Sequence, residues 1–188
     1  MFIQTEQTPN PQTLKFLPGK VVMDAGTAFY QNIDEAGDSP FAKRLFAVEG
    51  VSGVFFGSDF ITITKNNAYE WEVIKPLVLG SIIDHFNSED KTVEKNSEKE
   101  AQKSLQTNED DSDIVKQIKE LLDTRVRPAV AMDGGDIIYN DFADGVVYLK
   151  MQGACSGCPS STATLKMGIE NMLKHYIPEV QEVRAFDG

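Results

Sequence analysis

The sequence predicts an α+β protein made of two small domains that are joined by a flexible acidic linker. Each half of the chain combines short strand-like runs with amphipathic helix patterns, a mixture typical of small α+β domains. A charged stretch with little apolar character separates the halves. The length of 188 residues suits one large domain or two small ones. We therefore expect domains at residues 1–87 and 113–188, with the linker at residues 88–112.

The first domain is expected to begin with strands. Residues 2–5 resemble a short strand, and the prolines at positions 9 and 11 predict a turn or an extended loop. Residues 13–17 alternate as a half-buried strand does. Residues 21–23 are a candidate short strand, and residues 24–37 are expected to form a loop.

A short helix and a hairpin follow. Ser39 as N-cap and Pro40 as first helical residue predict a helix that ends at Gly50. Its inward face is expected to carry Phe41, Leu45 and Val48. Residues 54–56 and 60–64 flank a Gly-Ser-Asp sequence, which predicts a hairpin with a three-residue loop.

A longer helix is predicted to close the first domain. Asn67 and Glu70 lie three residues apart and resemble a capping box. Pro76 inside the helical pattern predicts a kink or a late helix start. The inward face of this helix is expected to carry Trp71, Ile74, Val78, Ile82 and His85.

The linker prediction rests on composition. Residues 88–112 are dominated by Glu, Asp, Lys and Asn and offer few apolar side chains whose burial would offset the entropy of ordering. This composition favours a flexible or partly helical linker over a single solvated helix held by Glu–Lys pairs.

The second domain is predicted to have the order helix, strand, strand, cysteine loop, helix, strand. A helix capped by Ser112 or Asp113 should kink at Pro128 and end at the Asp-Gly-Gly of residues 133–135. Hairpin strands follow on either side of the Ala-Asp-Gly turn at residues 143–145. A helix then begins near residue 160, is broken by Pro178, and precedes a last strand at residues 180–186. This helix should present Leu165, Ile169, Met172, Leu173 and Tyr176 at helical spacing.

The charge excludes several classes of partner. The chain has 18 basic and 29 acidic residues and a net charge of −11, which repels phosphate backbones and anionic lipids. We therefore expect neither nucleic-acid nor membrane binding. The first residues show no secretory signal or organelle presequence pattern, and no apolar run reaches membrane-spanning length. Two cysteines suggest a reducing compartment, so the chain is expected in the cytosol.

Cys155 and Cys158, the two cysteines of the chain, are the candidate site residues. Their C-x-x-C spacing in a glycine-rich loop suits a dithiol oxidoreductase, a zinc site or an iron–sulfur site better than a pair that only packs. The βαβ pattern of a thioredoxin-like domain does not precede them. Pro159 at a helix start should direct free N–H groups and the helix dipole at the loop, which would lower the thiol pKa values.

A metal site at these cysteines needs further ligands. Zinc and iron–sulfur centres usually take four, and the chain offers two thiols. His85 belongs to the other domain, and His175 lies several helical turns beyond Cys158. A second copy of the chain would complete the set, because two cysteine loops that meet across a two-fold axis supply four thiolates. Separation of the subunits would remove half of the ligands, which suits transfer better than storage.

Two independent sets of motifs resemble one family. Arg-Val-Arg-Pro-Ala-Val at 125–130, Met-Asp-Gly-Gly-Asp-Ile at 132–137 and Gly-Ala-Cys-Ser-Gly-Cys-Pro-Ser-Ser at 153–161 resemble the C-terminal domain of NifU and Nfu-type proteins. The first half resembles the domain that precedes it in Nfu proteins, at residues 4–11, 14–16, 54–57 and 59–62. The charged residues of these motifs are read structurally: Asp133 and Asp136 as part of a turn, Arg125 and Arg127 as solvated helix residues.

This resemblance implies a non-enzymatic scaffold or carrier of iron–sulfur clusters. It implies a [4Fe–4S] cluster that Cys155 and Cys158 of two subunits ligate, so that the chain is a homodimer when it holds the cluster. An upstream assembly scaffold would supply the cluster, and apo iron–sulfur proteins would receive it. The first domain has no cysteine and is expected to recognise partner proteins. The expected location is the cytoplasm of a bacterium, or the mitochondrial matrix for a processed chain.

Overall fold

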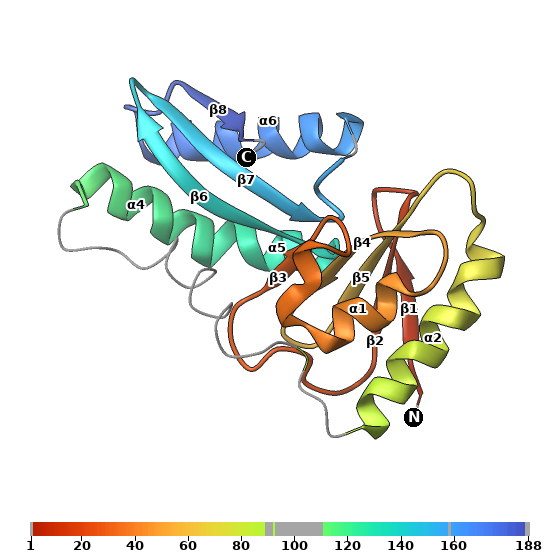
Figure 1. Cartoon of the computed structure of the whole chain (residues 1–188). Helices are drawn as coiled ribbons and strands as arrows, with labels where there is room; N and C mark the ends of the chain where they lie inside the picture. Colours follow the sequence, from red (N-terminus) through yellow and green to blue (C-terminus); the bar gives the residue numbers. More distant parts are fainter. Residues whose placement is uncertain (1, 89–91, 93–110, 158, 187–188) are drawn as a thin grey trace.

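The computed structural model describes residues 2–88, 92, 111–157 and 159–186, which form two α+β domains (Figure 1). Each domain has its own cluster of buried hydrophobic side chains. The side chains of residues 38 and 159–161 are not described. Most of the predicted linker and Cys158 lie outside the described residues, so those predictions remain predictions. Within the described residues no helix is both long and apolar enough to cross a bilayer.

The first domain is a five-stranded antiparallel sheet in the order β1-β2-β5-β4-β3, with helices on one face (Figure 1). Its α-helices are α1 and α2, and a 3₁₀ turn, η1, precedes α1. The strands are β1 (Gln4–Gln7), β2 (Thr13–Leu17), β3 (Ala28–Tyr30), β4 (Val51–Phe56) and β5 (Ile61–Lys65). The helical segments are η1 (Glu35–Asp38), α1 (Pro40–Phe46) and α2 (Trp71–Asn87).

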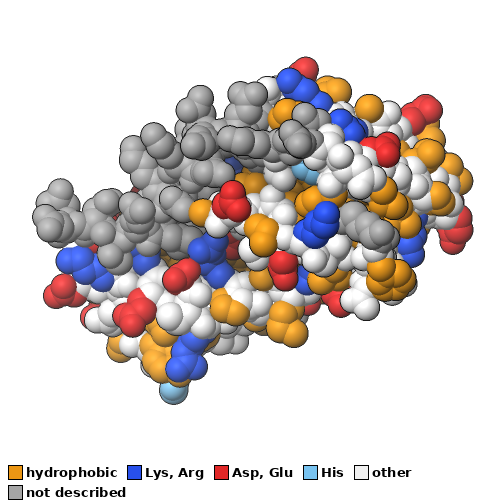
Figure 2. Space-filling model, turned by 90° about the horizontal axis from the view of Figure 1, so that it is seen from below, with side chains coloured by type: hydrophobic (Ala, Val, Ile, Leu, Met, Phe, Trp, Pro, Cys, Tyr) orange, Lys and Arg blue, Asp and Glu red, His pale blue; other side chains and the backbone are white. Residues whose placement is uncertain are grey.

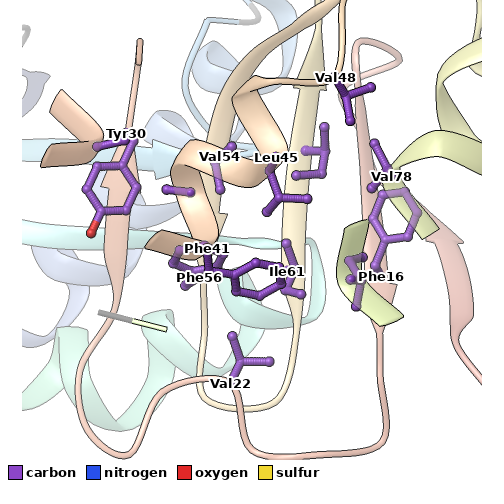
Figure 3. Close-up of a cluster of buried hydrophobic side chains, with 14 of the residues drawn as sticks. Phe16, Val22, Tyr30, Phe41, Leu45, Val48, Val54, Phe56, Ile61 and Val78 are labelled. Carbon is purple, nitrogen blue, oxygen red and sulfur yellow. The ribbon is translucent and has the colours of Figure 1, made fainter. Parts of the chain in front are cut away.

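Aromatic and branched side chains fill the space between this sheet and its helices (Figure 3). Phe16, Phe41, Phe56 and Ile61 are fully buried there, and the rings of Phe41 and Phe56 stack with centroids 5.1 Å apart. The cap of α1 is as predicted, because the Ser39 hydroxyl accepts a hydrogen bond from the third helical N–H at 3.0 Å.

Several predictions for the first domain are wrong in detail. Residues 21–23 are irregular, although two of them are buried, and β3 and η1 lie inside the expected loop. The capping box is also wrong: α2 begins after Glu70 without a side-chain cap, and the Asn67 side chain instead accepts a hydrogen bond from Gln12. Pro76 lies inside the helix, which begins at Trp71, so the late helix start that this proline allowed is not observed.

The side of α2 that faces away from the sheet carries exposed apolar side chains. Val73 and Leu77, four residues apart, are 59% and 53% exposed. In Figure 2 hydrophobic side chains gather at the right, on the half of the molecule that the first domain forms.

The second domain has the predicted order, with helices on one side of a three-stranded sheet in the order β6-β7-β8 (Figure 1). β6 and β7 form the expected hairpin, and β8 pairs parallel to β7. The elements are α4 (Asp113–Leu121), η2 (Leu122–Val126), α5 (Arg127–Met132), β6 (Gly135–Ala143), β7 (Val146–Gly153), α6 (Pro159–Tyr176) and β8 (Glu182–Ala185).

Pro128 changes the predicted helix in a specific way. The segment η2 is a π-helical turn, in which the N–H of Arg127 donates to the carbonyl of Leu122. A proline cannot donate and its ring crowds the carbonyl four residues earlier, so a wider turn ahead of it lets the chain continue as α5. The sequence predicted a kink, and the structure provides a π-bulge.

The face of the first sheet that points away from α1 and α2 is covered by the second domain. The strand register places Lys15, Thr62, Phe55 and Phe29 next to one another on it. Together with Thr13 they form what we call the outer face. Phe55 and Thr62 are each 1% exposed, and β4 and β5 contact β7. The half-buried reading of residues 13–17 is therefore wrong, because β2 is buried on both sides.

Candidate functional site

The candidate site lies at the connection between β7 and α6. β7 ends at Gly153 and α6 begins at Pro159, as the predicted strand-to-helix junction requires. Gly153 and Gly157 have φ values of 64° and 78°, a left-handed conformation that favours glycine. The N–H of Ser156 donates to the carbonyl of Gly153 at 3.1 Å and closes a tight turn around Cys155.

Cys155 is a buried free thiol that packs into the core of its own domain. Its side chain is 6% exposed and belongs to the cluster that includes Val147, Leu149 and Ile169. Gly135 makes room for the sulfur, since a Cβ at that position would lie 2.7 Å from Cys155 Sγ. Gly135 is therefore required by the sulfur and by the carbonyl oxygen of Gln152, which the same Cβ would approach to 2.6 Å.

The environment of Cys155 reverses one expectation. Burial, followed by the charges of Asp133 and Asp136, raises the pKa of Cys155 to about 12. The prediction of a lowered pKa is wrong for this residue because desolvation disfavours the thiolate more than the start of α6 stabilises it. In this arrangement the thiol is neutral near pH 7. Cys158 lies outside the described residues and its predicted pKa stays untested.

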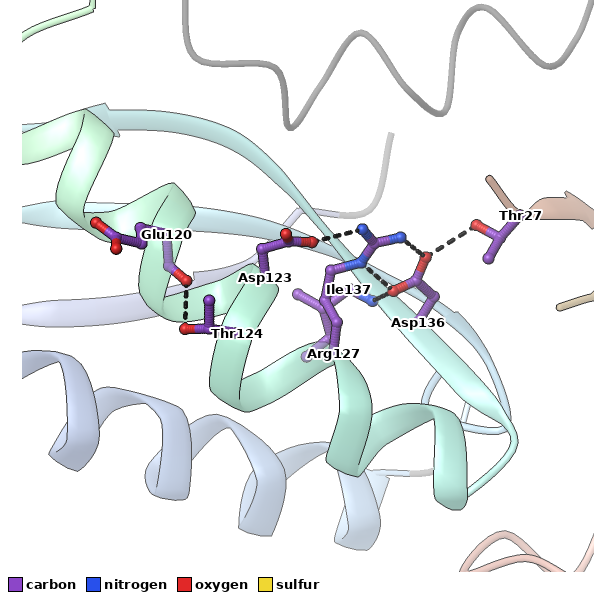
Figure 4. Close-up of polar contacts among 7 residues, drawn as sticks. All are labelled: Thr27, Glu120, Asp123, Thr124, Arg127, Asp136 and Ile137. Carbon is purple, nitrogen blue, oxygen red and sulfur yellow. Dashed lines mark hydrogen bonds and ion pairs between the residues drawn. The ribbon is translucent and has the colours of Figure 1, made fainter. Parts of the chain in front are cut away.

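A charged network lies beside the cysteine turn (Figure 4). The Arg127 guanidinium donates from Nε and Nη2 to the two carboxylate oxygens of Asp136, each at 2.8 Å. Asp136 is 3% exposed and also accepts from the N–H of Ile137 at 2.8 Å and the hydroxyl of Thr27 at 2.9 Å. The hydrogen bond with Asp136, reinforced by its charge, raises the pKa of Arg127 above its usual value.

This network corrects the reading of one arginine. Arg127 was expected to be a solvated helix residue, but its side chain is 24% exposed and paired with a buried carboxylate. Arg125 is exposed as expected and lies over the ring of Tyr176, 5.2 Å from its centroid. The four donors to Asp136 leave its carboxylate occupied, which agrees with a structural rather than a ligand role.

Residues of the first domain form hydrogen bonds with two segments next to Cys155: the turn between α5 and β6, and the turn that contains Ser156. The Thr62 hydroxyl donates to the carbonyl of Gly134 at 2.7 Å, and the Lys15 ammonium donates to the carbonyls of Ala131 and Met132 at 3.0 and 3.1 Å. The Asn10 side chain donates to the carbonyl of Ser156 at 3.4 Å. No local pattern in the sequence predicts these contacts, because each joins residues far apart in the chain.

A cavity of about 610 Å³ continues along the seam between the domains. Asn10, Phe29 and Lys65 line it from the first domain, and Lys150, Ser156 and Phe186 from the second. It opens beside the cysteine turn, so the seam gives solvent a route to that turn.

The histidines supply no ligand to the site. His85 is 3% exposed in the first domain, where its ring stacks on Phe41 with centroids 3.7 Å apart. His175 is exposed near the end of α6, next to Tyr176. Among the described residues no three His, Cys, Asp or Glu side chains gather as a metal site would require.

Cys155 is the one thiol that the described residues of this turn provide. Cys155 is a soft thiol ligand, and a thiolate is what zinc and iron–sulfur centres prefer. Within the part of the chain that the structure describes, no carboxylate or imidazole completes a coordination sphere around it.

Both domains match known families. Residues 3–89 match the model of the scaffold protein Nfu/NifU N-terminal domain, and residues 118–184 match the NifU-like domain. The chain is 52% identical to NifU-like protein 4, mitochondrial, of Arabidopsis thaliana over 100% of the chain and 67% of that protein. It is 50% identical to the NFU1 iron-sulfur cluster scaffold homolog, mitochondrial, of Homo sapiens over 97% of the chain and 71% of that protein.

A solved structure also resembles part of the chain. The solution structure of a NifU-like protein from Saccharomyces cerevisiae is 27% identical, with a TM-score of 0.46, and covers 51% of this chain and 87% of that one.

Proposed function

The chain belongs to the Nfu/NifU family of scaffold proteins, and we propose that it carries an iron–sulfur cluster as cargo rather than catalysing a reaction. The relative from Homo sapiens is an iron–sulfur cluster scaffold by name, which supports this role. We propose Cys155 and Cys158 as the ligands.

One observation carries the proposal. Cys155 is a single soft ligand at a strand-to-helix turn, and the described residues around it offer no third group of a metal site. With Cys158 the chain supplies two thiolates, which is half of a four-thiolate site. A second subunit that presents the same turn across a two-fold axis completes it. We propose that this centre is a [4Fe–4S] cluster and that its binding makes the protein a homodimer.

The shared site suits delivery. Separation of the subunits removes two of the four ligands, so a recipient that offers its own thiolates can take the cluster. We propose that apo iron–sulfur proteins are the recipients and that an upstream assembly scaffold is the donor. The first domain, in which no cysteine occurs, is proposed to recognise these proteins. Relatives named above are mitochondrial by name, which favours the mitochondrial matrix over a bacterial cytoplasm.

The geometry of Cys155 speaks against a thiol oxidoreductase. Such an enzyme needs an accessible cysteine of low pKa, because the thiolate is the attacking nucleophile. Cys155 is 6% exposed, and burial raises its pKa to about 12.

Anaerobic reconstitution of the full chain with ferrous iron and sulfide tests the proposal. We expect a Mössbauer spectrum of a [4Fe–4S] cluster and a native mass of two chains with one cluster. Cys155→Ser and Cys158→Ser should each abolish stable loading. Ser156→Ala, which alters the same turn but keeps both thiols, serves as the matched control and should load. A cluster-loaded monomer would contradict the shared site, and stoichiometric zinc without iron in protein purified anaerobically would favour a zinc-stapled module instead.

A further inference from the structure

We infer that the outer face of the first sheet is a docking surface for the cysteine-loop edge of the same chain, and that the two domains must separate before a cluster is loaded. The cysteine-loop edge is the open end of the β6–β7 hairpin together with the end of α5 that leads into it, residues 131–136 and 153–156. The part of this inference that concerns loading rests on the proposed function, whereas the docked arrangement does not.

The composition of the outer face does not explain its burial by itself. Thr13, Lys15 and Thr62 are polar, yet they are 2%, 7% and 1% exposed. Polar groups that lose water on burial need hydrogen-bond partners, since an unpaired buried group loses its hydration without compensation. A sheet face that carries such polar side chains remains exposed to water unless a partner supplies hydrogen-bond acceptors for them.

The cysteine-loop edge supplies those acceptors. At the end of α5 the Lys15 ammonium donates to the carbonyls of Ala131 and Met132 at 3.0 and 3.1 Å, and the Ala131 carbonyl also accepts from the N–H of Gly134. A cation at this end also complements the helix dipole. The Thr62 hydroxyl binds the carbonyl of Gly134 at 2.7 Å. Lys15 and Thr62 both bind backbone carbonyls, so this part of the match depends on the fold of the turn.

Shape complements this chemistry. Gly134 has a φ of 82°, and a Cβ there would lie 2.9 Å from the Thr62 hydroxyl oxygen. A Cβ on Gly153 would lie 3.0 Å from the ring of Phe55. Both glycines flank Cys155 in space, and both admit the outer face only because they lack a side chain. The fit is therefore specific to this edge of the second domain.

The docked domain occupies the approach that a second subunit needs. A shared cluster requires the partner's cysteine loop to come within a few ångströms of Cys155 and Cys158. In the structure the first domain contacts the turns on both sides of Cys155, through Gly134, Gly153 and the carbonyl of Ser156. Two chains cannot meet at this edge while their own first domains are seated on it.

The contacts are of a kind that separates readily. Interfaces between domains of one chain resemble transient protein–protein interfaces when polar contacts dominate them. The polar contacts here are hydroxyl, amide and ammonium groups on carbonyls, with Thr27 on Asp136 as the hydroxyl–carboxylate pair among those described above, and the ring of Phe55 against Gly153 is the apolar contact beside them. Water can replace each of them after separation.

Lysine footprinting of the full-length, cluster-free protein tests the docked arrangement directly. An amine-reactive acetylating ester should modify Lys15 at least about tenfold more slowly than the exposed Lys20 and Lys43 of the same domain, because Lys15 is 7% exposed and donates to two carbonyls of the second domain. Its own domain adds an ion pair with Glu6 and the ring of Phe60, so the response to domain opening in the variants below is the decisive readout. Modification of Lys15 as fast as these lysines would overturn the inference.

Thr62→Arg opens the interface in a controlled way. The long side chain cannot fit against Gly134, but it can extend into solvent from the outer face once the domains separate. We expect Lys15 to become about tenfold more reactive. Gln7→Arg, an exposed residue of β1, adds the same charge and should leave the rate unchanged. Thr62→Val together with Thr27→Val removes two interdomain hydrogen bonds without added bulk, and should raise the rate by a smaller factor.

Cluster loading of the same variants separates the two claims. Thr62→Arg should take up a cluster several-fold faster than the unmodified chain and to the same final amount. Equal loading rates, with Lys15 already exposed in Thr62→Arg, would overturn the requirement for separation. If neither the unmodified chain nor any variant loads a cluster, the proposed function fails, while the footprint still decides whether the domains dock.

Discussion

Removal of the Asp136 carboxylate should destabilise the second domain while the first domain keeps its own stability. Asp136→Ala takes away the acceptor of four hydrogen bonds, two of them from Arg127. The guanidinium is then left partly buried without its main partner. Loss of one member of a buried ion pair costs about 3–5 kcal/mol, because the remaining charge is uncompensated.

The structure places the expected value at the lower end of that range. The Arg127 side chain is 24% exposed, and it keeps a second carboxylate, Asp123, at 3.1 Å. Asp123 is 61% exposed and so contributes little. We therefore expect Asp136→Ala to lower the free energy of unfolding by about 3 kcal/mol. Thr27→Val, which removes only the interdomain hydroxyl, should cost about 1 kcal/mol.

Two spectroscopic signals distinguish the domains in one urea titration. Trp71 is the single tryptophan of the chain and lies at the start of α2, so its fluorescence follows the first domain. Far-ultraviolet circular dichroism follows the helices of both domains. In Asp136→Ala a part of the dichroism transition should move to lower urea, while the tryptophan transition moves much less. This separation also avoids a two-state analysis of the whole chain.

A double-mutant cycle with Arg127→Met tests the reason for the effect. The double variant lacks both charges, so it should be less destabilised than the sum of the single variants by about 2 kcal/mol. Strict additivity would refute the claim that the unpaired guanidinium dominates. A change below about 0.5 kcal/mol in Asp136→Ala alone would refute the buried pair as a source of stability.

Three further variants test other parts of the structure. Gly135→Ala places a Cβ 2.7 Å from the sulfur of Cys155 and should lower the free energy of unfolding by about 1–3 kcal/mol. The control is Gly168→Ala in α6, which has open space around it and should not destabilise the protein. Urea midpoints measured by circular dichroism compare the two variants. Burial raises the pKa of Tyr139 to about 12, whereas the pKa of tyrosine in the unfolded chain is about 10. The contribution of this group to stability is therefore complete below about pH 10 and is lost as the pH rises from about 10 to about 12. Tyr139→Phe should flatten that loss, which unfolding experiments at stepped pH measure. Ser39→Ala removes the cap of α1 and should cost about 1 kcal/mol in the tryptophan-monitored transition.

Local signals in the sequence predicted those elements that local chemistry determines. Ser39 and Pro40 start α1 as expected, and the hairpin of the second domain turns at Asp144 and Gly145 with φ values of 51° and 78°. Such caps and turns depend on the conformations of a few adjacent residues. The sequence did not predict the strand β3, because it is only three residues long and is held in place by pairing with β4, which is distant in sequence.

The proposed ligands come from a local pattern in the sequence, whereas the environment of Cys155 does not. The spacing of Cys155 and Cys158 identified the candidate ligands, because spacing is local. The pKa of Cys155 depends on burial, which arises from Gly135 and the hydrophobic core of a folded domain. The pairing of Arg127 with Asp136 likewise requires α5 and β6 to pack together, and a helix pattern alone does not reveal it.

The glycine pair at positions 134 and 135 links these findings. In the sequence, a turn from helix to strand is enough to explain the two glycines. In the structure each glycine also admits a neighbour: Gly135 admits the sulfur of Cys155, and Gly134 admits Thr62 of the other domain. The same turn therefore determines both how deeply the Cys155 thiol is buried and where the first domain contacts the second.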